Sequence, residues 1–388
     1  MEELKYTLVK TPEELASAIE NLSPQPALGF DAETTSLDPF DQAKGTRLRL
    51  VQFAAPNSTY VFDLDRIVPE GTRGTRAEEL SGSVALDPLR RLLAARAPVK
   101  IAHNAKFDAK WVRAFLGVEL CGEFDSRTNS NGAERVERGG LFDTMLASQV
   151  VSAGEQEDRH SLEAVVGRYL DRAVDKSQQV SDWGGELSPA QLEYAARDAA
   201  LLLPLRDKLV EALRSASLGR CAQLEFECVV PVATLELNGI FLDKERWREQ
   251  LAVVEKRRAV LAEELQVMLA EESPQQSFFG PTRLDINLDS HVQLTRALQR
   301  RGIELPDGTR NWKLQPLAEK HAEIKTLLEY RTVQKALTSY GENILEEIKP
   351  ATGRLHANFH QIGAPTGRMA CTQPNIQQVP HAHEYRRC

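Results

Sequence analysis

The chain has 388 residues, a formal net charge of −8, and ordinary shares of hydrophobic (42%) and charged (27%) residues. This length is sufficient for two or three domains, and the acidic balance excludes a uniformly basic nucleic-acid-binding surface but not local basic patches. No apolar run is long enough to span a bilayer, and the N-terminal residues lack the pattern of a secretory signal. We therefore expect no membrane partner and a cytoplasmic location, or an organellar one if a transit segment has been removed.

The N-terminal part of the chain predicts a helix followed by strands. Thr11, Pro12 and Glu14 have the types and spacing of a capping box with proline at the first helical position, which predicts a helix start. Three apolar segments then predict a meander of short strands, because each is bounded by glycine or proline. These segments are residues 28–33, 47–54 and 59–63.

The first of these strands carries two carboxylates, Asp31 and Glu33. Side chains two residues apart on a strand point to the same face, so these two converge. Converging carboxylates repel each other and are costly to desolvate, and a divalent cation is the usual compensation. A hard-metal site is the first hypothesis, and a solvated Asp-x-Glu turn is the alternative.

The alternation of strands and helices continues to about residue 215, which predicts an α/β domain with a mixed sheet. The last helix of this part has the start signals of Ser188, Pro189 and Gln191. The expected elements are a loop at 70–83, a helix at 87–95, a strand at 99–102, a helix through 111 and 115, a loop at 122–140, and helices at 143–152, 161–170 and 188–215.

After about residue 215 the chain carries mostly helical signal, including a long amphipathic run at 243–272. The final forty residues lose this periodicity and contain proline, glycine, histidine and amide side chains instead. We therefore predict a domain boundary near residues 215–219 and a mostly helical region after it.

Two further segments add acids that join Asp31 and Glu33 in one hypothesis. Asp108 starts a helix directly after a strand, where ligands collect in α/β sheets. Tyr194 and Asp198 are four residues apart and share one face of a helix. The ordinary alternatives are that Asp108 is an acid that stabilises a helix start and that Tyr194 and Asp198 form a half-buried helix face. That every one of these alternatives is true at once is a weaker explanation than one shared site.

Three motifs of this chain resemble those of the DEDD 3′–5′ exonuclease superfamily, in its tyrosine-bearing subgroup. They are Asp31-x-Glu33, His103-Asn104-x-Lys106-Phe107-Asp108 and Tyr194-x-x-x-Asp198. Residues 142–146 also resemble the connecting segment of that family. The resemblance covers about residues 1–215 and implies an α/β ribonuclease-H-like fold, a mixed sheet with flanking helices.

The resemblance implies phosphodiester hydrolysis with two metal ions, Mg²⁺ or Mn²⁺. Asp31 would bridge the two ions. Glu33 and Asp198 would complete the shell of the inner ion, and Asp108 would hold the outer one. The phenol of Tyr194 would orient the attacking water for in-line displacement.

The same resemblance implies contacts to the terminal nucleotides from four side chains. These are Thr34, Leu37, Asn104 and Lys106. Leu37 would wedge between bases, which suits a single-stranded 3′ end. His103 is interpreted as a structural residue rather than a metal ligand.

The C-terminal part resembles family A, polymerase-I-type DNA polymerases. Residues 227–243 are similar to the entry to the thumb of that family, and residues 353–380 to the segment that leads into its palm. In the family such residues contact primer and template, largely through backbone and minor groove. The candidates here are Gln361, Arg368, Asn375 and Gln377. A polar, proline-rich loop is the alternative for this stretch.

These resemblances predict three parts. Residues 1–215 form a 3′–5′ exonuclease domain, residues 216–350 a helical thumb-like part of a family A polymerase domain, and residues 351–388 the truncated start of a palm. The sequence ends before the palm carboxylates and fingers helix that polymerisation needs. We therefore expect no polymerase activity from this chain alone, and a second chain that carries the rest of the polymerase is one hypothesis.

The leading hypothesis is a metal-dependent exonuclease of proofreading type that acts on DNA 3′ ends, single-stranded or in a primer-template. An RNA exonuclease of ribonuclease D type is the enzyme alternative, because residues 176–198 also resemble that family. A DNA-binding or assembly subunit that pairs with a separate polymerase chain is the non-enzyme alternative.

Overall fold

The structure is a computed structural model. It describes residues 4–41, 45–69, 71, 76–122, 140–152, 159–178, 180–269, 276–277, 280–281, 286–305 and 308–388. The chain forms two compact units. Unit 1 comprises Met1–Gly239, Pro350–Thr352 and His356–Gln373, and unit 2 comprises Ile240–Lys349, Gly353–Leu355 and Pro374–Cys388.

Unit 1 is built on a mixed sheet of six strands. They are β1 (Thr7–Val9), β2 (Ala27–Thr34), β3 (Leu48–Ala55), β4 (Ser58–Asp63), β5 (Val99–Ala102) and β6 (Leu141–Asp143). Their order in the sheet is β1-β4-β3-β2-β5-β6. β2, β3 and β4 form the predicted antiparallel meander, while β1 pairs in parallel with β4, and β5 and β6 extend the sheet in parallel beyond β2. The predicted mixed sheet is therefore confirmed.

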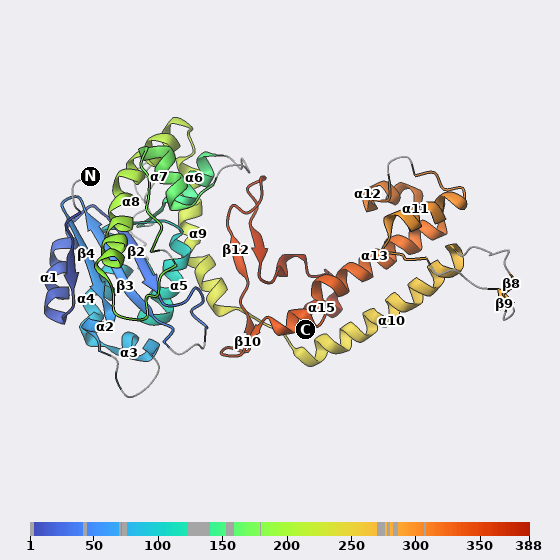
Figure 1. Cartoon of the computed structure of the whole chain (residues 1–388), viewed down its shortest axis with the longest axis horizontal. Helices are drawn as coiled ribbons and strands as arrows, with labels where there is room; N and C mark the ends of the chain where they lie inside the picture. Colours follow the sequence, from blue (N-terminus) through green and yellow to red (C-terminus); the bar gives the residue numbers. More distant parts are fainter. Residues whose placement is uncertain are drawn as a thin grey trace. The chain divides into compact units, whose positions relative to one another are not determined.

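Helices flank this sheet (Figure 1). In chain order they are α1 (Pro12–Leu22), α2 (Leu64–Ile67), α3 (Arg76–Gly82), α4 (Asp87–Ala94), α5 (Ala105–Leu116), α6 (Thr144–Val151), α7 (Leu162–Leu170), α8 (Pro189–Ser215) and α9 (Gly219–Asn238), with a 3₁₀ turn at Val84–Leu86. Two of them begin with the predicted capping boxes: the hydroxyl of Thr11 accepts from the N–H of Glu14, and that of Ser188 from the N–H of Gln191.

Helix α8 runs across one face of the sheet, where it packs on β2, β3 and β4 (Figure 1). A Cβ atom at Gly29 would lie 2.0 Å from the carbonyl oxygen of Ala199. Because alternate residues of a strand share a face, Asp31 and Glu33 lie on the same face as Gly29, toward α8. The opposite face of β2 carries Phe30, which is fully buried in the main apolar core of unit 1.

Unit 2 is mainly helical, with α10 and α13 packed along each other. Its elements are β7 (Ile240–Phe241), α10 (Lys244–Leu269), β8 (Gln276–Ser277), β9 (Gly280–Pro281), α11 (His291–Arg300), α12 (Asn311–Leu314), α13 (Ala322–Tyr340), α14 (Asn343–Glu346), β10 (Ile348–Lys349), β11 (Arg354–Leu355) and α15 (His383–Arg386), with 3₁₀ turns at Gln315–Leu317 and Ile376–Gln378. The buried Trp247 donates a hydrogen bond from Nε1 to the carbonyl of Tyr340 (3.1 Å). This contact ties α10 to the end of α13.

Several short elements were not predicted from the sequence. Helix α3 lies inside the expected loop at 70–83, and β1 and β6 are edge strands of three residues each. Strands this short do not give a readable alternation of apolar and polar residues. In the C-terminal segment, β12 (Asn358–His360) and β13 (Ala370–Thr372) form an antiparallel pair within unit 1. Most of the expected loop at 122–140 lies outside the described residues.

Unit 1 extends beyond the boundary expected at residues 215–219, because α9 belongs to its core. Helix α9 packs on α5, α6 and β6. The rings of Phe226 and Phe142 lie 4.8 Å apart, centroid to centroid. The division between the compact units falls at Gly239.

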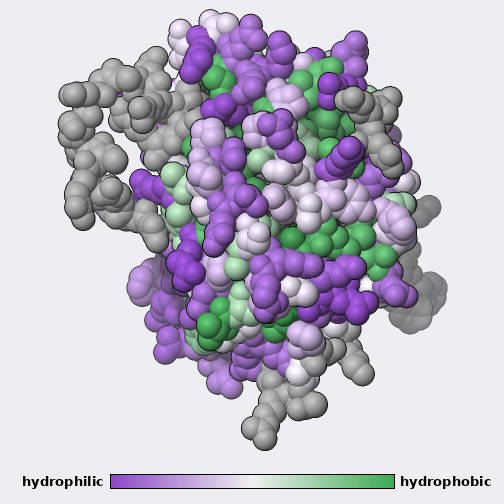
Figure 2. All heavy atoms as spheres, turned by 90° about the vertical axis from the view of Figure 1, so that its left-hand side faces the viewer, coloured by the Kyte–Doolittle hydropathy of each residue, from purple (hydrophilic) through white to green (hydrophobic). Residues whose placement is uncertain are grey.

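The surface of the molecule is largely polar where Figure 2 shows it. Hydrophilic side chains cover most of that face, and hydrophobic ones reach it in separate small areas. Among the helices that the structure describes, none combines the length and apolar character needed to cross a bilayer.

We predict that Gly29→Ala destabilises the fold by about 1–3 kcal/mol, because the added methyl group would collide with a backbone carbonyl that cannot move alone. Urea unfolding midpoints measure the change. The matched control is Gly167→Ala, an exposed position in α7 where the nearest atom to the new Cβ is 3.9 Å away. There alanine is expected to be neutral or stabilising. Equal midpoints for the two variants would contradict the close approach of α8 to β2.

Candidate active site

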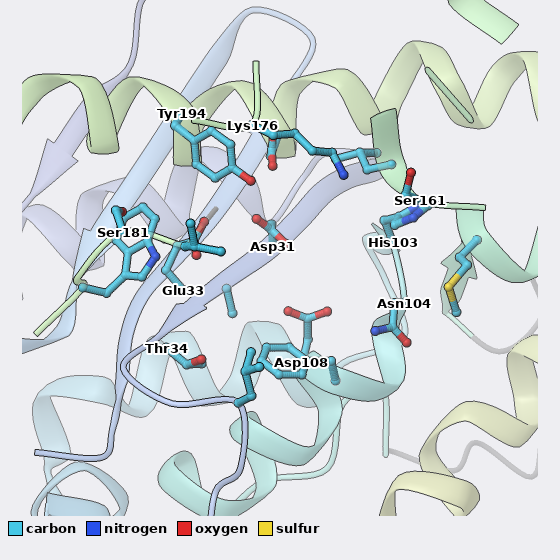
Figure 3. Close-up of a pocket in the computed structure, with 18 of the residues that line it drawn as sticks. Asp31, Glu33, Thr34, His103, Asn104, Asp108, Ser161, Lys176, Ser181 and Tyr194 are labelled. Atoms are coloured by element: carbon cyan, nitrogen blue, oxygen red, sulfur yellow. The ribbon is translucent and has the colours of Figure 1, made fainter. Parts of the chain in front are cut away.

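A pocket of about 670 Å³ opens beside β2 in unit 1, and four carboxylates line it. Asp31 and Glu33 come from β2, Asp108 from α5 and Asp198 from α8. Figure 3 shows Asp31, Glu33 and Asp108 pointing into the same space, with Tyr194 above them. The structure therefore brings together all five residues that the sequence motifs had selected for catalysis.

Asp108 is positioned by the turn that joins β5 to α5. Asn104 precedes α5 in the left-handed conformation (φ 61°, ψ 48°), which directs the chain from the strand into the helix. The turn is held by the buried carboxylate of Asp143, which accepts four backbone N–H groups. Their donors are Asn104 (3.2 Å), Ala105 (2.8 Å), Met145 (2.8 Å) and Leu146 (3.1 Å). Asp143 therefore fixes the first turns of both α5 and α6.

Tyr194 and Asp198 lie one helical turn apart on α8, and a hydrogen bond joins their side chains. Burial and the neighbouring acids raise the pKa of Tyr194, so the phenol stays protonated and donates to the carboxylate. The rings of Trp183 and Tyr194 lie 6.3 Å apart, centroid to centroid, and both residues line the pocket. The phenolic hydroxyl is thus held beside the acids.

The pKa values of all four carboxyl groups are raised. Burial is the largest cause, and it raises the pKa of Asp31, Glu33 and Asp108 well above the ordinary carboxyl range. The charge of Asp31 raises the pKa of both Glu33 and Asp108 further. Burial also raises the pKa of Asp198 to about 6, although the hydrogen bond from Tyr194 opposes this. A nearby positive charge would relieve all four groups.

This donor set fits a hard divalent cation. Carboxylate oxygens are the ligands that Mg²⁺ prefers in proteins. The Oδ1 atom of Asp198 is buried and has no hydrogen-bond partner within the part of the chain that the structure describes. The same part of the chain contains no group of three or more His, Cys, Asp or Glu side chains already set at metal-binding separations. The acids would therefore reach a shared ion by side-chain rotation.

Three of the four residues expected to contact terminal nucleotides also line the pocket: Thr34, Leu37 and Asn104. Leu37 is 86% exposed although it is a large apolar side chain. The fourth residue, Lys106, does not line this pocket. Successive helix residues turn by about 100°, so Lys106 and Asp108 leave α5 in nearly opposite directions.

Lys106 instead joins a buried ion pair on the other side of α5. Its Nζ lies 2.6 Å from Oε1 of Glu236 on α9 and 2.8 Å from Oδ1 of Asn358. Lys110 lies 2.7 Å from the other oxygen of the same carboxylate. The N–H of Phe359 also donates to Glu236 (2.7 Å). This network anchors β12 on α5 and α9, and the position of Lys106 does not support the expected contact with a nucleotide in the pocket.

The four residues expected to contact primer and template occupy different environments. Gln361 is 7% exposed and donates from Nε2 to the carbonyl and the carboxylate of Glu225 (2.8 and 2.9 Å), so its amide is already engaged. Arg368 is exposed. Asn375 and Gln377 are also exposed, and Oδ1 of Asn375 accepts from the N–H of Gln377 (3.1 Å). For these last three residues the DNA contact stays a prediction.

His103, which the sequence analysis interpreted as a structural residue, follows β5 directly and lines the pocket. Burial lowers its pKa to about 4, so the ring is neutral near pH 7. Nδ1 lies 2.9 Å from the hydroxyl of Thr144, which itself donates to the carbonyl of Ala102. Because that hydroxyl proton is used, Nδ1 of His103 is the donor.

The sequence motifs missed several residues that line the pocket. Phe107, His160, Lys176, Ser181 and Trp183 are examples. Phe107 lies within a motif and could have been selected. His160 lies before α7. Lys176, Ser181 and Trp183 lie between α7 and α8, within the residues that resemble ribonuclease D, but that resemblance was not used to assign them to the site.

Comparisons with known proteins identify the families that this chain resembles. A family model described as 3′–5′ exonuclease matches residues 6–214, and one described as DNA polymerase family A matches residues 255–388. DNA polymerase I of Aquifex aeolicus is 30% identical over 395 residues, which cover 97% of this chain and 58% of that protein. DNA polymerase I of Pseudomonas aeruginosa is 26% identical over 391 residues, 97% of this chain and 39% of that protein.

A solved structure supports the fold. The POL domain of Pol1 from M. smegmatis, in complex with DNA primer-template and dNTP, has a TM-score of 0.67 and 22% identity, over 98% of this chain and 57% of that one. This likeness is evidence for the fold alone. The chain spans about two fifths to three fifths of the length of the curated relatives named above.

The chain belongs to the 3′–5′ exonuclease family, because that family's model covers more than half of it. The exonuclease domain is followed by part of a family A DNA polymerase region. Both of the family resemblances found in the sequence are thereby confirmed.

The raised pKa of Asp198 predicts that this acid reduces stability near neutral pH. The pKa of an ordinary Asp is 3.8, and that of Asp198 in the folded chain is about 6. Between pH 3.8 and about 6 the folded chain therefore binds more protons than the unfolded chain. Stability therefore falls as the pH rises from about 4 to about 6 and stays reduced above that. Asp198→Asn should remove this dependence.

The measurement is urea unfolding in EDTA at pH 4 and pH 7.5. We expect Asp198→Asn to be more stable than the wild type by about 1–3 kcal/mol at pH 7.5 and to differ little at pH 4. Asp207→Asn is the matched control, because Asp207 lies on the same helix with a side chain that is 72% exposed. An Asp198→Asn protein that is less stable than the wild type at pH 7.5 would contradict the electrostatic account.

Proposed function

We propose that this chain is a divalent-metal-dependent 3′–5′ exonuclease that removes nucleotides from the 3′ end of single-stranded DNA. The observation that carries the proposal is the convergence of four carboxylates and a phenol, from β2, α5 and α8, on one pocket. Membership of the exonuclease family supports the reaction type. DNA, rather than RNA, is proposed because the similar full-length proteins are named DNA polymerase I.

The pocket would hold two ions, Mg²⁺ or Mn²⁺, through Asp31, Glu33, Asp108 and Asp198. Asp31 would be the shared ligand, because its charge already influences both Glu33 and Asp108. When bound, such ions lower the pKa of the attacking water and stabilise the leaving oxygen. The high pKa values of the acids support this role, since cation binding would release their protons and strengthen with rising pH.

Tyr194 and Asp198 would orient the water. The phenol of Tyr194 donates to Asp198, which leaves the phenolic oxygen able to accept a hydrogen bond from the nucleophile. The water oxygen bonds to phosphorus as the bond from phosphorus to O3′ breaks. One water proton is lost and O3′ gains one, so the products are a nucleoside 5′-monophosphate and a strand with a free 3′-hydroxyl.

The rim of the pocket would select a frayed end. Leu37 exposes most of its side chain beside Thr34, which is a cost unless something apolar covers it. A nucleobase face is a suitable cover, since bases stack on apolar side chains whatever their sequence. Paired duplex ends would have to open before a terminal nucleotide could enter.

The C-terminal part would bind the DNA that supplies this end. We propose that residues 216–350 are the thumb-like part and residues 351–388 the first part of the palm of a family A polymerase domain, with residues 1–215 as the exonuclease domain. The family matches at 6–214 and 255–388 support the separation of an exonuclease part from a polymerase part. Primer-template DNA is the proposed partner, by analogy with the M. smegmatis complex. A separate chain with the remaining polymerase parts is the second partner that we propose.

The test uses 5′-labelled 20-mers of DNA and of RNA, incubated with Mg²⁺ or with EDTA and separated on a denaturing gel. We expect DNA to shorten from its 3′ end with Mg²⁺ only. Asp31→Ala and Asp198→Ala should lower the rate at least about 100-fold, because each removes charge that the metal ions need. Asp207→Ala, on the same helix as Asp198 but exposed, should keep the wild-type rate.

A preference for RNA would contradict the DNA substrate and favour the ribonuclease D-type alternative. If neither strand is digested, the result would contradict the proposal that the chain is an exonuclease and would favour a DNA-binding or assembly subunit.

A further inference from the structure

Lys176 is a pocket residue that the catalytic scheme above leaves unused. Among the described residues that line the pocket it is the only lysine or arginine. Figure 3 shows its side chain lying inside the pocket between Tyr194 and His103, on the side of the acids that faces α8. A single cation is therefore directed at a space bounded by four carboxylates.

The connecting segment that follows Lys176 is tied to α8 at Ser181 and Asp182. It lies between α7 and α8 without regular secondary structure. The Nε2 atom of Gln191, in the first turn of α8, donates to the hydroxyl of Ser181 (3.1 Å) and to the carbonyl of Asp182 (2.9 Å). The same helix carries Tyr194, and both Lys176 and Tyr194 line the pocket.

The charge of Lys176 acts inside the pocket. It opposes the effect of burial and lowers the pKa of Asp198. Burial is the main cause of the low pKa of His103, and the charge of Lys176 adds to it. The ammonium group is thus close enough to influence residues on two sides of the space where a substrate would lie.

A stabilising surface ion pair does not explain this lysine. Outside the pocket Lys176 forms an ion pair with Glu163, at 3.7 Å, and the side chains are 28% exposed for Lys176 and 57% exposed for Glu163. A pair of this length and exposure contributes little to stability.

A phosphodiester substrate explains it better. Bound divalent ions would offset the carboxylates, but the phosphate brings its own negative charge, which spreads over the non-bridging oxygens during cleavage. An ammonium group at the pocket wall can stabilise the charge on these oxygens without being a metal ligand.

We propose that Lys176 is a catalytic residue whose ε-ammonium group binds a non-bridging oxygen of the scissile phosphate. This inference rests on the proposed exonuclease function. It assigns the charge-stabilising role to a side chain outside the three acidic motifs.

The experiment compares wild type, Lys176→Gln, Lys176→Arg and Glu163→Gln in the full chain on two substrates. One is 5′-fluorescein-labelled oligothymidylate of ten nucleotides. The other is the p-nitrophenyl ester of thymidine 5′-monophosphate, which contains only the phosphate that is cleaved. Binding of the labelled strand in EDTA, by fluorescence anisotropy, gives a readout that needs neither metal nor turnover. Thermal unfolding checks that each variant is folded.

We expect Lys176→Gln to lower kcat/KM about 100-fold on both substrates, the scale of losing one charge-stabilising donor. The strand should bind about tenfold more weakly in EDTA, and Tm should change little. Lys176→Arg should restore at least a tenth of the lost rate, because the charge is kept. Glu163→Gln should stay within twofold of wild type.

Three results would overturn the proposal. One is a Lys176→Gln variant that cleaves the ester at the wild-type rate and the strand more slowly, which would mean that Lys176 contacts a phosphate other than the scissile one. Another is a loss that Lys176→Arg does not restore and that comes with a lower Tm, which would make the lysine structural. The third is unchanged binding in EDTA for Lys176→Gln. If the wild type cleaves neither substrate, the proposed function fails separately, and the anisotropy result alone decides the role of Lys176.

Discussion

The candidate active site depends on the close contact between β2 and α8 at Gly29. The carbonyl of Ala199 occupies the volume that a side chain would need, so strand and helix meet backbone to backbone. Asp31 lies two residues beyond Gly29 on the same face, and Asp198 directly precedes Ala199. One backbone contact therefore sets how near these two acids can come. Tyr194, one turn earlier on α8, is placed by the same contact.

Burial of an acid is not by itself a sign of chemistry, as two carboxylates of this domain illustrate. Asp143 is as deeply buried as the site acids, but it accepts four backbone N–H groups and links two helix starts. Asp198 has an oxygen without a partner among the described residues, and Asp31 adds to the repulsion around it. The first acid stabilises the fold, while the second is retained at a cost in stability, as is common at functional sites.

The fold and the acids were readable from the sequence because their signals are local. Capping residues, apolar strands and the spacing of Asp31 and Glu33 each act within a few residues. The expected nucleotide contact of Lys106 is not supported by its position outside the pocket, which helix geometry could have indicated, since a residue two positions before Asp108 faces the opposite side of α5. Lys176 and α9 were not predictable in the same way. Their roles arise from contacts between segments distant in sequence, and no periodicity encodes those.

The most direct test of the account is anomalous diffraction from crystals of the full chain grown with Mn²⁺ and thymidine 5′-monophosphate. Manganese scatters anomalously, so its position can be read without assumptions about the ligands. The account predicts two Mn²⁺ peaks roughly 3.5–4 Å apart, both within bonding distance of Asp31, with Glu33 and Asp198 on one ion and Asp108 on the other. A single ion, or ions that bind away from Asp31, would contradict the two-metal exonuclease that we infer from β2 and α8.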